Sequence, residues 1–251
     1  MTDLYERGMA TAVGCWQHFA SGTEGATVLH ARGVSAAVFP LGPERAIYKN
    51  AVLERDLSDG GRRSALAAME DAYRAAGVTS YAAWVHESDT AMIVELERRG
   101  YAWSEVTRAM AISLDDLVAP APTVELREPS WPEYWDFLQL VDVPSGLLSG
   151  VDATRLDVVM ATVDGTNVAT GLSFDHHGDC GIFNVATLPW ARRRGFGTAL
   201  TAHLLHAARR RGCTTASLQS TPAAERLYTA LGFEDLGRIL EYAPRAGAVS
   251  T

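Results

Sequence analysis

Lysine is almost missing from this sequence of 251 residues, since Lys49 is the only one and the other strongly basic side chains are all arginines. Acidic residues outnumber basic ones, 30 to 22, and the formal net charge is −8. A chain of this balance lacks the basic face that nucleic-acid binding requires. We therefore expect no nucleic-acid partner.

Cysteines and long apolar runs are also scarce. Cys15, Cys180 and Cys213 have no short spacing and are odd in number, which favours free thiols in a reducing compartment and does not support a metal site. No apolar run approaches the ~18 residues of a membrane span. The N-terminal segment MTDLYERGMATAVGCW lacks the order of a secretion signal. A cytoplasmic protein with no membrane contact and no bound metal is expected.

One proline-rich stretch, LVAPAPTVE, interrupts the chain. Pro120 and Pro122 break any helix or strand there. The length fits one large domain or two smaller ones. The stretch therefore predicts an N-terminal domain over residues 1–117, a linker over 118–122 and a C-terminal domain over 123–251.

Strands and helices alternate in both halves. The C-terminal half reads β-α-β-β-β-α-β-α-β, with hairpin turns at Asp164-Gly165 and DHHGD. The N-terminal half repeats this plan at low similarity, which indicates two similar domains. The predicted class is α/β, each domain having a mixed, mostly antiparallel central sheet flanked by helices. Helices are expected at 4–19, 63–77, 89–100, 131–141, 196–211 and 223–231, and strands at 26–31, 35–41, 46–57, 79–85, 101–112, 123–128, 157–188 (three strands), 214–219 and 233–242.

The junction TLPWARRRGFG joins a strand to the predicted helix at 196–211. The first turn of a helix has N–H groups without intrahelical partners and carries partial positive charge. Gly195 and Gly197 let an anion approach that backbone without meeting a Cβ. Arg192, Arg193 and Arg194 add complementary charge. The junction therefore predicts a cradle for a pyrophosphate.

Two other nucleotide motifs fail at named positions. A dinucleotide fingerprint needs a third glycine where this chain has Leu200, and a P-loop needs a lysine that the junction lacks. A solvated basic turn stays the alternative on these residues alone.

The wider context resembles the GCN5-related N-acetyltransferase (GNAT) superfamily. The family signature Arg/Gln-x-x-Gly-x-Gly/Ala follows a strand ending in Val-x-Pro, and here Pro189, Arg192, Gly195 and Gly197 have that spacing. A second family motif, Leu-Tyr-x-x-Leu-Gly-Phe, is matched by RLYTALGF at 226–233. The resemblance covers about residues 123–245.

The resemblance implies acetyl-CoA as cosubstrate. Main-chain amides from about Arg193 to Thr198 would hold its pyrophosphate, and the strand carrying Val185 would pair with its pantetheine arm. Tyr228 matches the family tyrosine near the sulfur, which can protonate the departing thiolate; a phenol pKa of ~10 and a thiol pKa of ~8.5 make this transfer plausible. The implied cofactor-binding residues are Val185, Thr187 (usually valine in the family), Arg192, Arg193, Arg194, Gly195, Phe196, Gly197 and Thr198.

The first repeat departs from this pattern. Its corresponding segment is SDGGRR, with Ser58 in place of Arg192 and Arg63 in place of Gly197, and Asp59 brings a negative charge. Leu96 stands where Tyr228 would be. We therefore expect one active copy and one degenerate copy.

The general base is not evident. The strand CGIFNVATL carries no acid, and its Asn184 can hold a water or a substrate but cannot accept a proton. His176 and its neighbour His177 carry imidazoles, which can accept a proton near neutral pH, but both lie in a hairpin turn. Asp142, Glu54 and a water chain are further candidates. Trp131, Tyr134 and Trp135 form an aromatic cluster that either packs in the core or lines the acceptor pocket.

The resulting hypothesis is an acetyl-CoA-dependent N-acetyltransferase that acts on a small-molecule amine by direct attack, without a covalent enzyme intermediate. A protein or peptide N-acetyltransferase and a non-catalytic CoA-binding sensor are the alternatives. A homodimer is compatible with these expectations.

Overall fold

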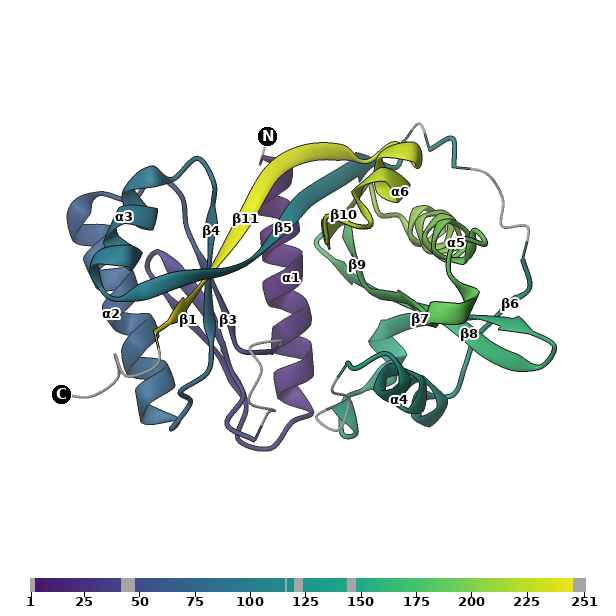
Figure 1. The fold of residues 1–251 in the computed structure, drawn as a ribbon, viewed down its shortest axis with the longest axis horizontal. Coiled ribbons are helices and arrows are strands. Elements are labelled where there is room, and N and C mark those ends of the chain that lie inside the picture. Colours follow the sequence, from purple (N-terminus) through teal and green to yellow (C-terminus); the bar gives the residue numbers. More distant parts are fainter. Residues whose placement is uncertain (1–2, 42–47, 116, 120–123, 144–147, 246–251) are drawn as a thin grey trace. The chain divides into compact units, whose positions relative to one another are not determined.

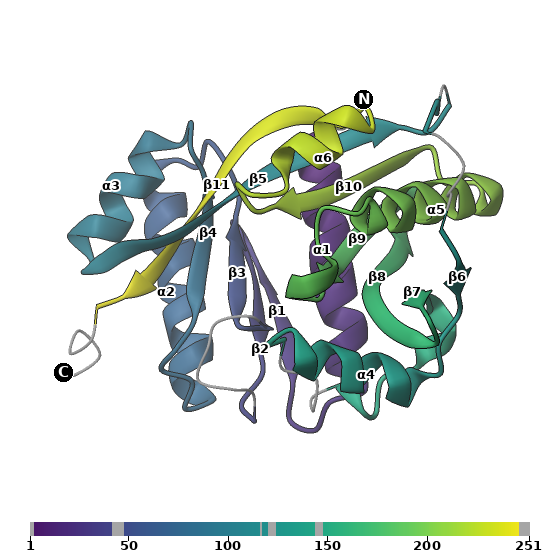
Figure 2. The ribbon, with the colours of Figure 1, turned by 45° about the vertical axis from the view of Figure 1, so that its right-hand side comes forward.

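The computed structural model describes residues 3–41, 48–115, 117–119, 124–143 and 148–245 (Figures 1 and 2). It divides into two compact units. Unit 1 comprises Met1–Cys15 and Ala109–Leu236, and unit 2 comprises Trp16–Arg108 and Gly237–Thr251. Each unit thus takes in a terminal segment of the other half of the sequence. The predicted boundary between the repeats stays a prediction, and linker residues 120–122 lie outside the described residues.

The helices and strands follow one another in the order expected from the sequence, and the predicted α/β class is confirmed. The strand expected over 46–57 is shorter than predicted, and residues 46–47 lie outside the described residues. The elements are α1 (Leu4–Ser21), β1 (Thr27–Ala31), β2 (Val34–Val38), β3 (Asn50–Leu53), α2 (Asp59–Ala75), β4 (Ala82–His86), α3 (Thr90–Arg98), β5 (Tyr101–Ser113), β6 (Leu126–Arg127), α4 (Trp131–Leu140), β7 (Leu156–Val163), β8 (Thr166–His176), β9 (Asp179–Thr187), α5 (Phe196–Arg211), β10 (Thr215–Ser220), α6 (Glu225–Ala230) and β11 (Glu234–Pro244).

Both predicted hairpin turns of the C-terminal half are present. Asp164 and Gly165 have φ values of 49° and 75°, and His177 and Gly178 have values of 47° and 79°. Positive φ at both central residues is the signature of a type I′ turn, whose twist suits two antiparallel strands. These turns join β7 to β8 and β8 to β9, so the three strands form an antiparallel meander.

Unit 2 is built on the strand order β1-β2-β3-β4-β11-β5. β3 and β4 pair in parallel, whereas β1–β2, β2–β3 and β4–β11 pair antiparallel. Ala83 and Val85 belong to a core shared with α2 and α3. Trp84, between them, points to the opposite face and contacts Trp16 of α1 edge-on at 5.2 Å between ring centroids. Helices therefore cover both faces of this sheet.

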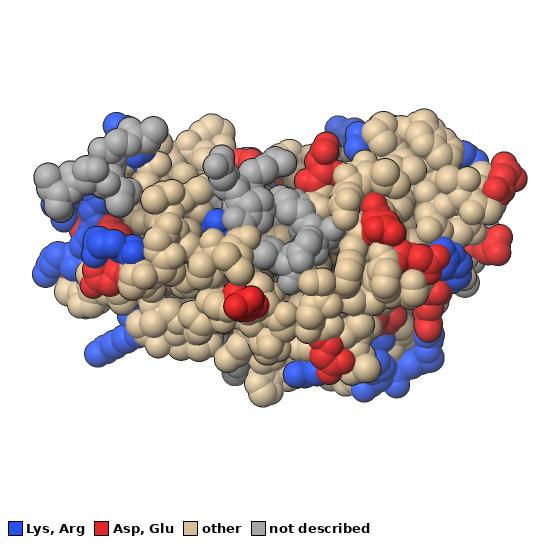
Figure 3. Space-filling view, turned by 90° about the horizontal axis from the view of Figure 1, so that it is seen from below, with Lys and Arg blue, Asp and Glu red and all other residues tan. Residues whose placement is uncertain are grey.

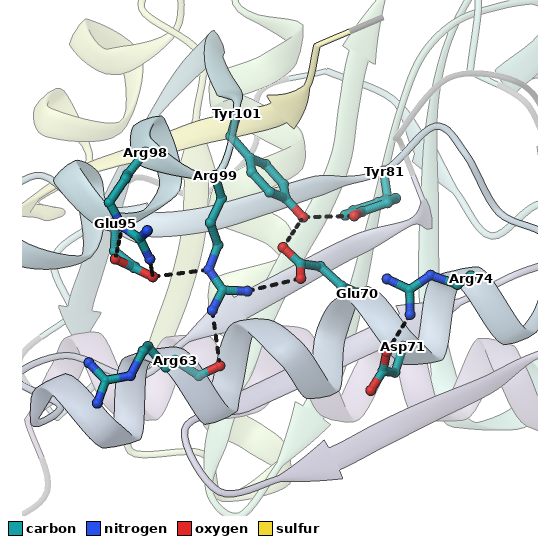
Figure 4. Close-up of polar contacts among 9 residues, drawn as sticks. All are labelled: Arg63, Glu70, Asp71, Arg74, Tyr81, Glu95, Arg98, Arg99 and Tyr101. Carbon is teal, nitrogen blue, oxygen red and sulfur yellow. Dashed lines mark hydrogen bonds and ion pairs between the residues drawn. The ribbon is translucent and has the colours of Figure 1, made fainter. Parts of the chain in front are cut away.

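A polar network joins α2, α3 and β5 within unit 2 (Figure 4). Arg99 binds Glu95 at 3.0 Å and Glu70 at 2.9 Å, and Tyr101 shares a 2.7 Å hydroxyl contact with Tyr81. Arg98, together with Arg99, lowers the pKa of Glu95 to about 2. The network connects α2 to α3, and the carboxylates of Glu70 and Glu95 are held in ion pairs with Arg99.

Unit 1 is built on the order β11-β5-β10-β9-β8-β7-β6, so β5 and β11 each contribute to both units. α5 packs along β7, β8 and β9, and α4 lies on the other side of these strands (Figure 2). Leu200 and Leu204 of α5 meet Ile182 of β9 in a buried core. Gly212, with φ 93°, ends α5 in a left-handed cap, and Gly232, with φ 96°, follows the end of α6.

The ionisation of Glu241 on β11 provides a test of unit 2. Burial, together with the like charge of Glu105, raises the pKa of the Glu241 carboxyl from 4.5 to about 7. The folded chain thus binds more protons than the unfolded chain between these values, so its stability falls as the pH rises from about 4.5 to 7. We expect Glu241→Gln to be more stable than the wild type at pH 8 and equal to it near pH 4, as measured by urea unfolding.

The matched control is Glu234→Gln, because Glu234 is an exposed glutamate on the same strand. An equal gain in stability for both variants, or no dependence on pH, would show that Glu241 does not carry the effect.

Candidate functional site

β9 and β10 of unit 1 part from each other after a short stretch of pairing. They pair in parallel over Asp179–Gly181 and Thr215–Ser217. β9 continues to Thr187 and β10 to Ser220. Along these fully described strands no further pair joins them. We call this open region, residues 182–187 of β9 and 218–220 of β10, the fork.

Val185 and Thr187 lie on the β9 arm of this fork. Thr187 and the neighbouring Ala186 pair with β8 on their other side, so the backbone groups directed toward β10 have no strand partner there. A row of unpaired N–H and C=O groups is an acceptor for an extended chain, which can add to it as a further strand.

A β-bulge lies inside the fork. The pairs Thr170↔Ala186 and Leu172↔Phe183 enclose one residue of β8 but two residues of β9, Asn184 and Val185. Asn184 has φ 51°, in the left-handed region. Bulges of this kind redirect a side chain and end regular pairing. The bulge thus re-aims the Asn184 side chain at the point where the strands separate.

The strand leads from the fork into the predicted anion cradle. Arg193 and Gly195 have φ values of 63° and 83°, and Gly195 is the N-cap of α5 with no side-chain hydrogen bond. Within the described chain no backbone carbonyl accepts a hydrogen bond from the N–H groups of residues 193–198. Successive free N–H groups in such a turn form a concavity for an anion, reinforced by the helix dipole.

The two glycines of the motif serve different purposes. A Cβ added to Gly195 would meet no atom within 4 Å, so space for a side chain or a ligand is present there. Glycine is favoured at this position because the backbone is left-handed. A Cβ added to Gly197 would lie 2.9 Å from Cδ1 of Leu227 on α6. Gly197 therefore permits close packing of α5 and α6, a role that the sequence interpretation did not include.

The three arginines of the junction are exposed, but they are not equivalent. Arg192 Nε donates a 3.2 Å hydrogen bond to the Thr187 carbonyl, which ties the loop to the end of β9. The Arg194 guanidinium lies 5.4 Å from the ring centroid of buried Phe196. Among the described residues none of the three forms an ion pair with a carboxylate. Their charge is available to an anionic ligand.

Tyr228 lies on α6, and its ring contacts Phe233 edge-on at 5.7 Å between centroids. The residue is buried, and this burial raises the pKa of the phenol to about 12. Tyr228 is therefore neutral throughout the physiological range and can act as a hydrogen-bond donor.

Two of the predicted acceptor-side residues come together through a third residue. Asn184 Nδ2 donates a 3.0 Å hydrogen bond to the hydroxyl of Tyr134, and the Tyr134 ring stacks on Trp131 with centroids 5.2 Å apart. Tyr134 belongs to the aromatic cluster expected from the sequence, and its spacing of three residues from Trp131 on a helix places both side chains on one face. Its contact with Asn184 was not expected.

His176 lies elsewhere. It pairs with Asp179 at the hairpin end of β8 and β9, five residues from Asn184, which is roughly 16 Å along a strand. Burial lowers the pKa of His176, with contributions from His177, whose ring centroid is 4.2 Å away, and from Arg155. The structure does not bring this histidine to the fork. Asp142 follows the end of α4, and Glu54 belongs to unit 2.

The corresponding region of unit 2 is closed. When Ser58 is aligned with Arg192, residues 50–52 of β3 correspond to residues 184–186 of β9. Residues 50–52 pair with Ala82–Trp84 of β4. The Ser58 side chain accepts a hydrogen bond from the Gly61 N–H at the start of α2, and Arg62 pairs with Asp59. The backbone groups of the strand and of the helix start, which are unpaired in unit 1, thus have partners within unit 2.

Metal chemistry offers no competing site among the residues that the structure describes. They include no group of three or more His, Cys, Asp or Glu side chains placed to hold a metal. On the face seen in Figure 3, acidic and basic side chains lie interspersed among uncharged ones. No helix within the described ranges is long and apolar enough to cross a membrane.

Comparison with known proteins agrees with this geometry. The sequence model of the acetyltransferase (GNAT) family matches residues 113–233. No curated protein sequence matches the chain. Among solved structures, a GCN5-related N-acetyltransferase from Kribbella flavida is similar over 96% of both chains, with 19% identity and a TM-score of 0.72.

Two further structures share the fold. A GCN5-related N-acetyltransferase from Sphaerobacter thermophilus has 20% identity and a TM-score of 0.62, over 87% of this chain and 82% of the other. A tandem GNAT protein from the clavulanic acid biosynthesis pathway has 16% identity and a TM-score of 0.61, over 87% and 79%. At these identities the likeness is one of fold.

The left-handed geometry of the cradle can be tested by stability. Gly195→Ala places a Cβ in open space but in an unfavourable backbone region, so we expect a loss of about 1 kcal/mol in the free energy of unfolding. Gly60→Ala, also in open space but inside α2, should raise stability by roughly 0.5–1 kcal/mol. Urea denaturation of both variants measures the contrast. Two changes of the same sign would contradict the backbone assignment.

Proposed function

We propose that unit 1 is an enzyme of the acetyltransferase (GNAT) family, whose sequence model matches residues 113–233, and that it transfers an acetyl group from acetyl-CoA to an amine of a small molecule. The observation that carries this proposal is the continuity of β9. β9 supplies the open backbone of the fork. The chain that follows it passes Arg192 and enters the cradle at the start of α5.

The residues present fit acetyl-CoA. The free N–H groups of residues 193–198 suit a pyrophosphate, and the exposed guanidiniums of Arg193 and Arg194 complement its charge. The β9 arm of the fork, with Val185 and Thr187, suits the extended pantetheine arm. Acetyl-CoA would supply an activated thioester. The chain's own part is to hold it in an extended form with its carbonyl carbon near the bulge.

The proposed reaction is direct attack by a free amine. The amine nitrogen forms a C–N bond to the acetyl carbon, the C–S bond breaks with its electron pair on sulfur, and the surplus proton on nitrogen passes to water. The three cysteines are buried, and burial raises the thiol pKa of Cys180 well above its usual value and that of Cys213 to about 11. Protonated thiols are poor nucleophiles, which supports a route without an acyl-enzyme.

Tyr228 is proposed as the donor that faces the leaving sulfur. With the phenol pKa at about 12, complete transfer to a thiolate of pKa ~8.5 would be uphill by roughly 3.5 units, or about 5 kcal/mol. We therefore assign Tyr228 the donation of a hydrogen bond that stabilises developing charge on sulfur, rather than the full proton transfer expected from the sequence.

On the acceptor side we infer roles for Asn184 and Trp131, which are connected through Tyr134. Aromatic rings beside a polar group favour a small molecule over a peptide, although a protein or peptide amine is the second candidate. His176 is a less favoured candidate because of its place at the hairpin. The expected cytoplasmic location and homodimer stay predictions, and unit 2 is proposed to be the degenerate copy.

A non-catalytic CoA-binding protein is the alternative of a different class. β9 carries no carboxylate within the fork that could act as a base, which favours this alternative. The retained Tyr228 argues against it. Thiol release from acetyl-CoA, measured with a panel of amines, distinguishes turnover from binding alone.

Coenzyme binding can be tested at the third helical position of each copy. Thr198→Glu places a carboxylate in the first turn of α5, where it favours the helix but repels a diphosphate. At about 5 Å and an effective dielectric constant of ~20, the repulsion is roughly 3 kcal/mol per charge pair. We expect acetyl-CoA affinity, measured by calorimetry, to fall at least ~100-fold.

Gly61→Glu is the matched control, because Gly61 is the third residue of α2, and Ser58 already caps that helix. Its affinity for acetyl-CoA should equal that of the wild type. Equal losses in the two variants would contradict a single coenzyme site in unit 1, and no binding by the wild type would refute the proposed function.

Tyr228→Phe tests the hydrogen bond to sulfur. Removal of one donor to a charged group should lower kcat by about 10- to 100-fold while acetyl-CoA affinity stays unchanged. Because the phenol pKa is about 12, Tyr228 stays protonated up to pH 10. Any fall of kcat with rising pH below pH 10 should therefore also be seen in the variant. Thiol release followed from pH 6 to 10 provides the measurement. An unchanged kcat would exclude Tyr228 from the chemical step.

A further inference from the structure

We propose that Tyr134 is a positioning residue: it holds Asn184 so that the Asn184 amide oxygen receives an N–H of the incoming amine. The turnover of primary relative to secondary amines is the readout of this contact. This inference rests on the proposed function of unit 1. Three observations carry it, beginning with the backbone of Asn184 inside the fork.

The first observation is the backbone of Asn184. A non-glycine residue at φ 51° in a strand is uncommon, and asparagine is among the residues that adopt this left-handed region most readily. The bulge places this residue where β9 no longer pairs with β10. The side chain thus leaves the regular alternation of the strand at the place proposed for the reacting carbonyl.

The second observation is how the amide is held. Asn184 Nδ2 donates to the Tyr134 hydroxyl at 3.0 Å. Asn184 Oδ1 forms no hydrogen bond with another described residue and is not one of the enclosed polar atoms that lack a partner. Anchoring the nitrogen therefore leaves the amide oxygen accessible. An amide oxygen accepts hydrogen bonds and cannot donate them, so it selects an N–H or O–H group.

The third observation is the rigidity of Tyr134. Its side chain is fully buried and stacks on Trp131 at an interplanar angle of 23°. Trp131 Nε1 donates a 3.0 Å hydrogen bond to the Leu148 carbonyl. The start of α4 is fixed by a capping box between Ser130 and Glu133. The hydroxyl that receives Asn184 thus belongs to a ring fixed by packing on a capped helix, which is the arrangement needed to orient a substrate group.

The preference for primary amines follows from counting hydrogens. A neutral primary amine has two N–H bonds, so one can stay on Asn184 Oδ1 while the nitrogen lone pair attacks the acetyl carbon. After the C–N bond has formed and the surplus proton has left to water, the product amide still has that N–H. A secondary amine yields an amide without an N–H, and the contact to Oδ1 is lost as the reaction proceeds.

Tyr134→Phe provides the test, because it keeps the ring and removes only the hydroxyl. Amines offered to the full-length chain with acetyl-CoA should be matched pairs, such as benzylamine with N-methylbenzylamine, and thiol release should be followed for each. We expect the wild type to favour the primary member by at least ~10-fold in kcat/KM. In Tyr134→Phe the kcat/KM for primary amines should fall about tenfold and the preference should shrink, with acetyl-CoA affinity unchanged.

Two further variants separate positioning from stability. Asn184→Gly removes the amide without adding strain at positive φ and should abolish the preference. Tyr81→Phe removes an equally buried tyrosine hydroxyl contact, the 2.7 Å pair with Tyr101 in unit 2 (Figure 4), and should leave the preference unchanged even if it lowers stability.

The outcomes are distinct. An unchanged preference in both Tyr134→Phe and Asn184→Gly, or an equal change in Tyr81→Phe, overturns the inference and leaves the proposed function standing. Acetyl-CoA binding by the wild type without thiol release on any pair overturns the inference together with the catalytic part of the proposal. Absence of acetyl-CoA binding refutes the proposed function itself.

Discussion

The separation of two parallel strands is the constraint on which the site depends. β9 and β10 pair at only three positions, and beyond Gly181 the sheet of unit 1 opens. A strand whose hydrogen-bonding groups are left open is normally a liability in a folded protein. Here the opening is held from both sides: α5 packs on one face of β9, and α4 lies on the other. The unpaired groups therefore have a fixed position and can serve a ligand.

The fold could be predicted from the sequence because its signals are local. Positive φ at Asp164-Gly165, the glycine after α6 and the alternation of the strands depend on neighbouring residues. The exchange of terminal segments between the units could not be predicted in this way. β5 and β11 each run as one continuous strand, and nothing in Tyr101–Ser113 indicates where its contacts change from one unit to the other.

The backbone geometry of the candidate site could be predicted where it follows from a motif. The prediction was incomplete where side chains from distant segments meet. The cradle depends on glycine and on the first turn of a helix, which are visible in the sequence. The contact between Asn184 and Tyr134 joins residues 50 positions apart, and the role of Gly197 depends on Leu227 of another helix. Such contacts form only when the chain has folded, and no single segment carries their signal.

The close approach at Gly197 links the two ends of the proposed coenzyme site. Leu227 lies against the glycine in the first turn of α5, and Tyr228 is its immediate neighbour in the chain. A side chain at position 197 would require the Leu227 Cδ1 methyl group to move. The fit between the two helices therefore limits the size of residue 197, independently of any demand made by a bound diphosphate.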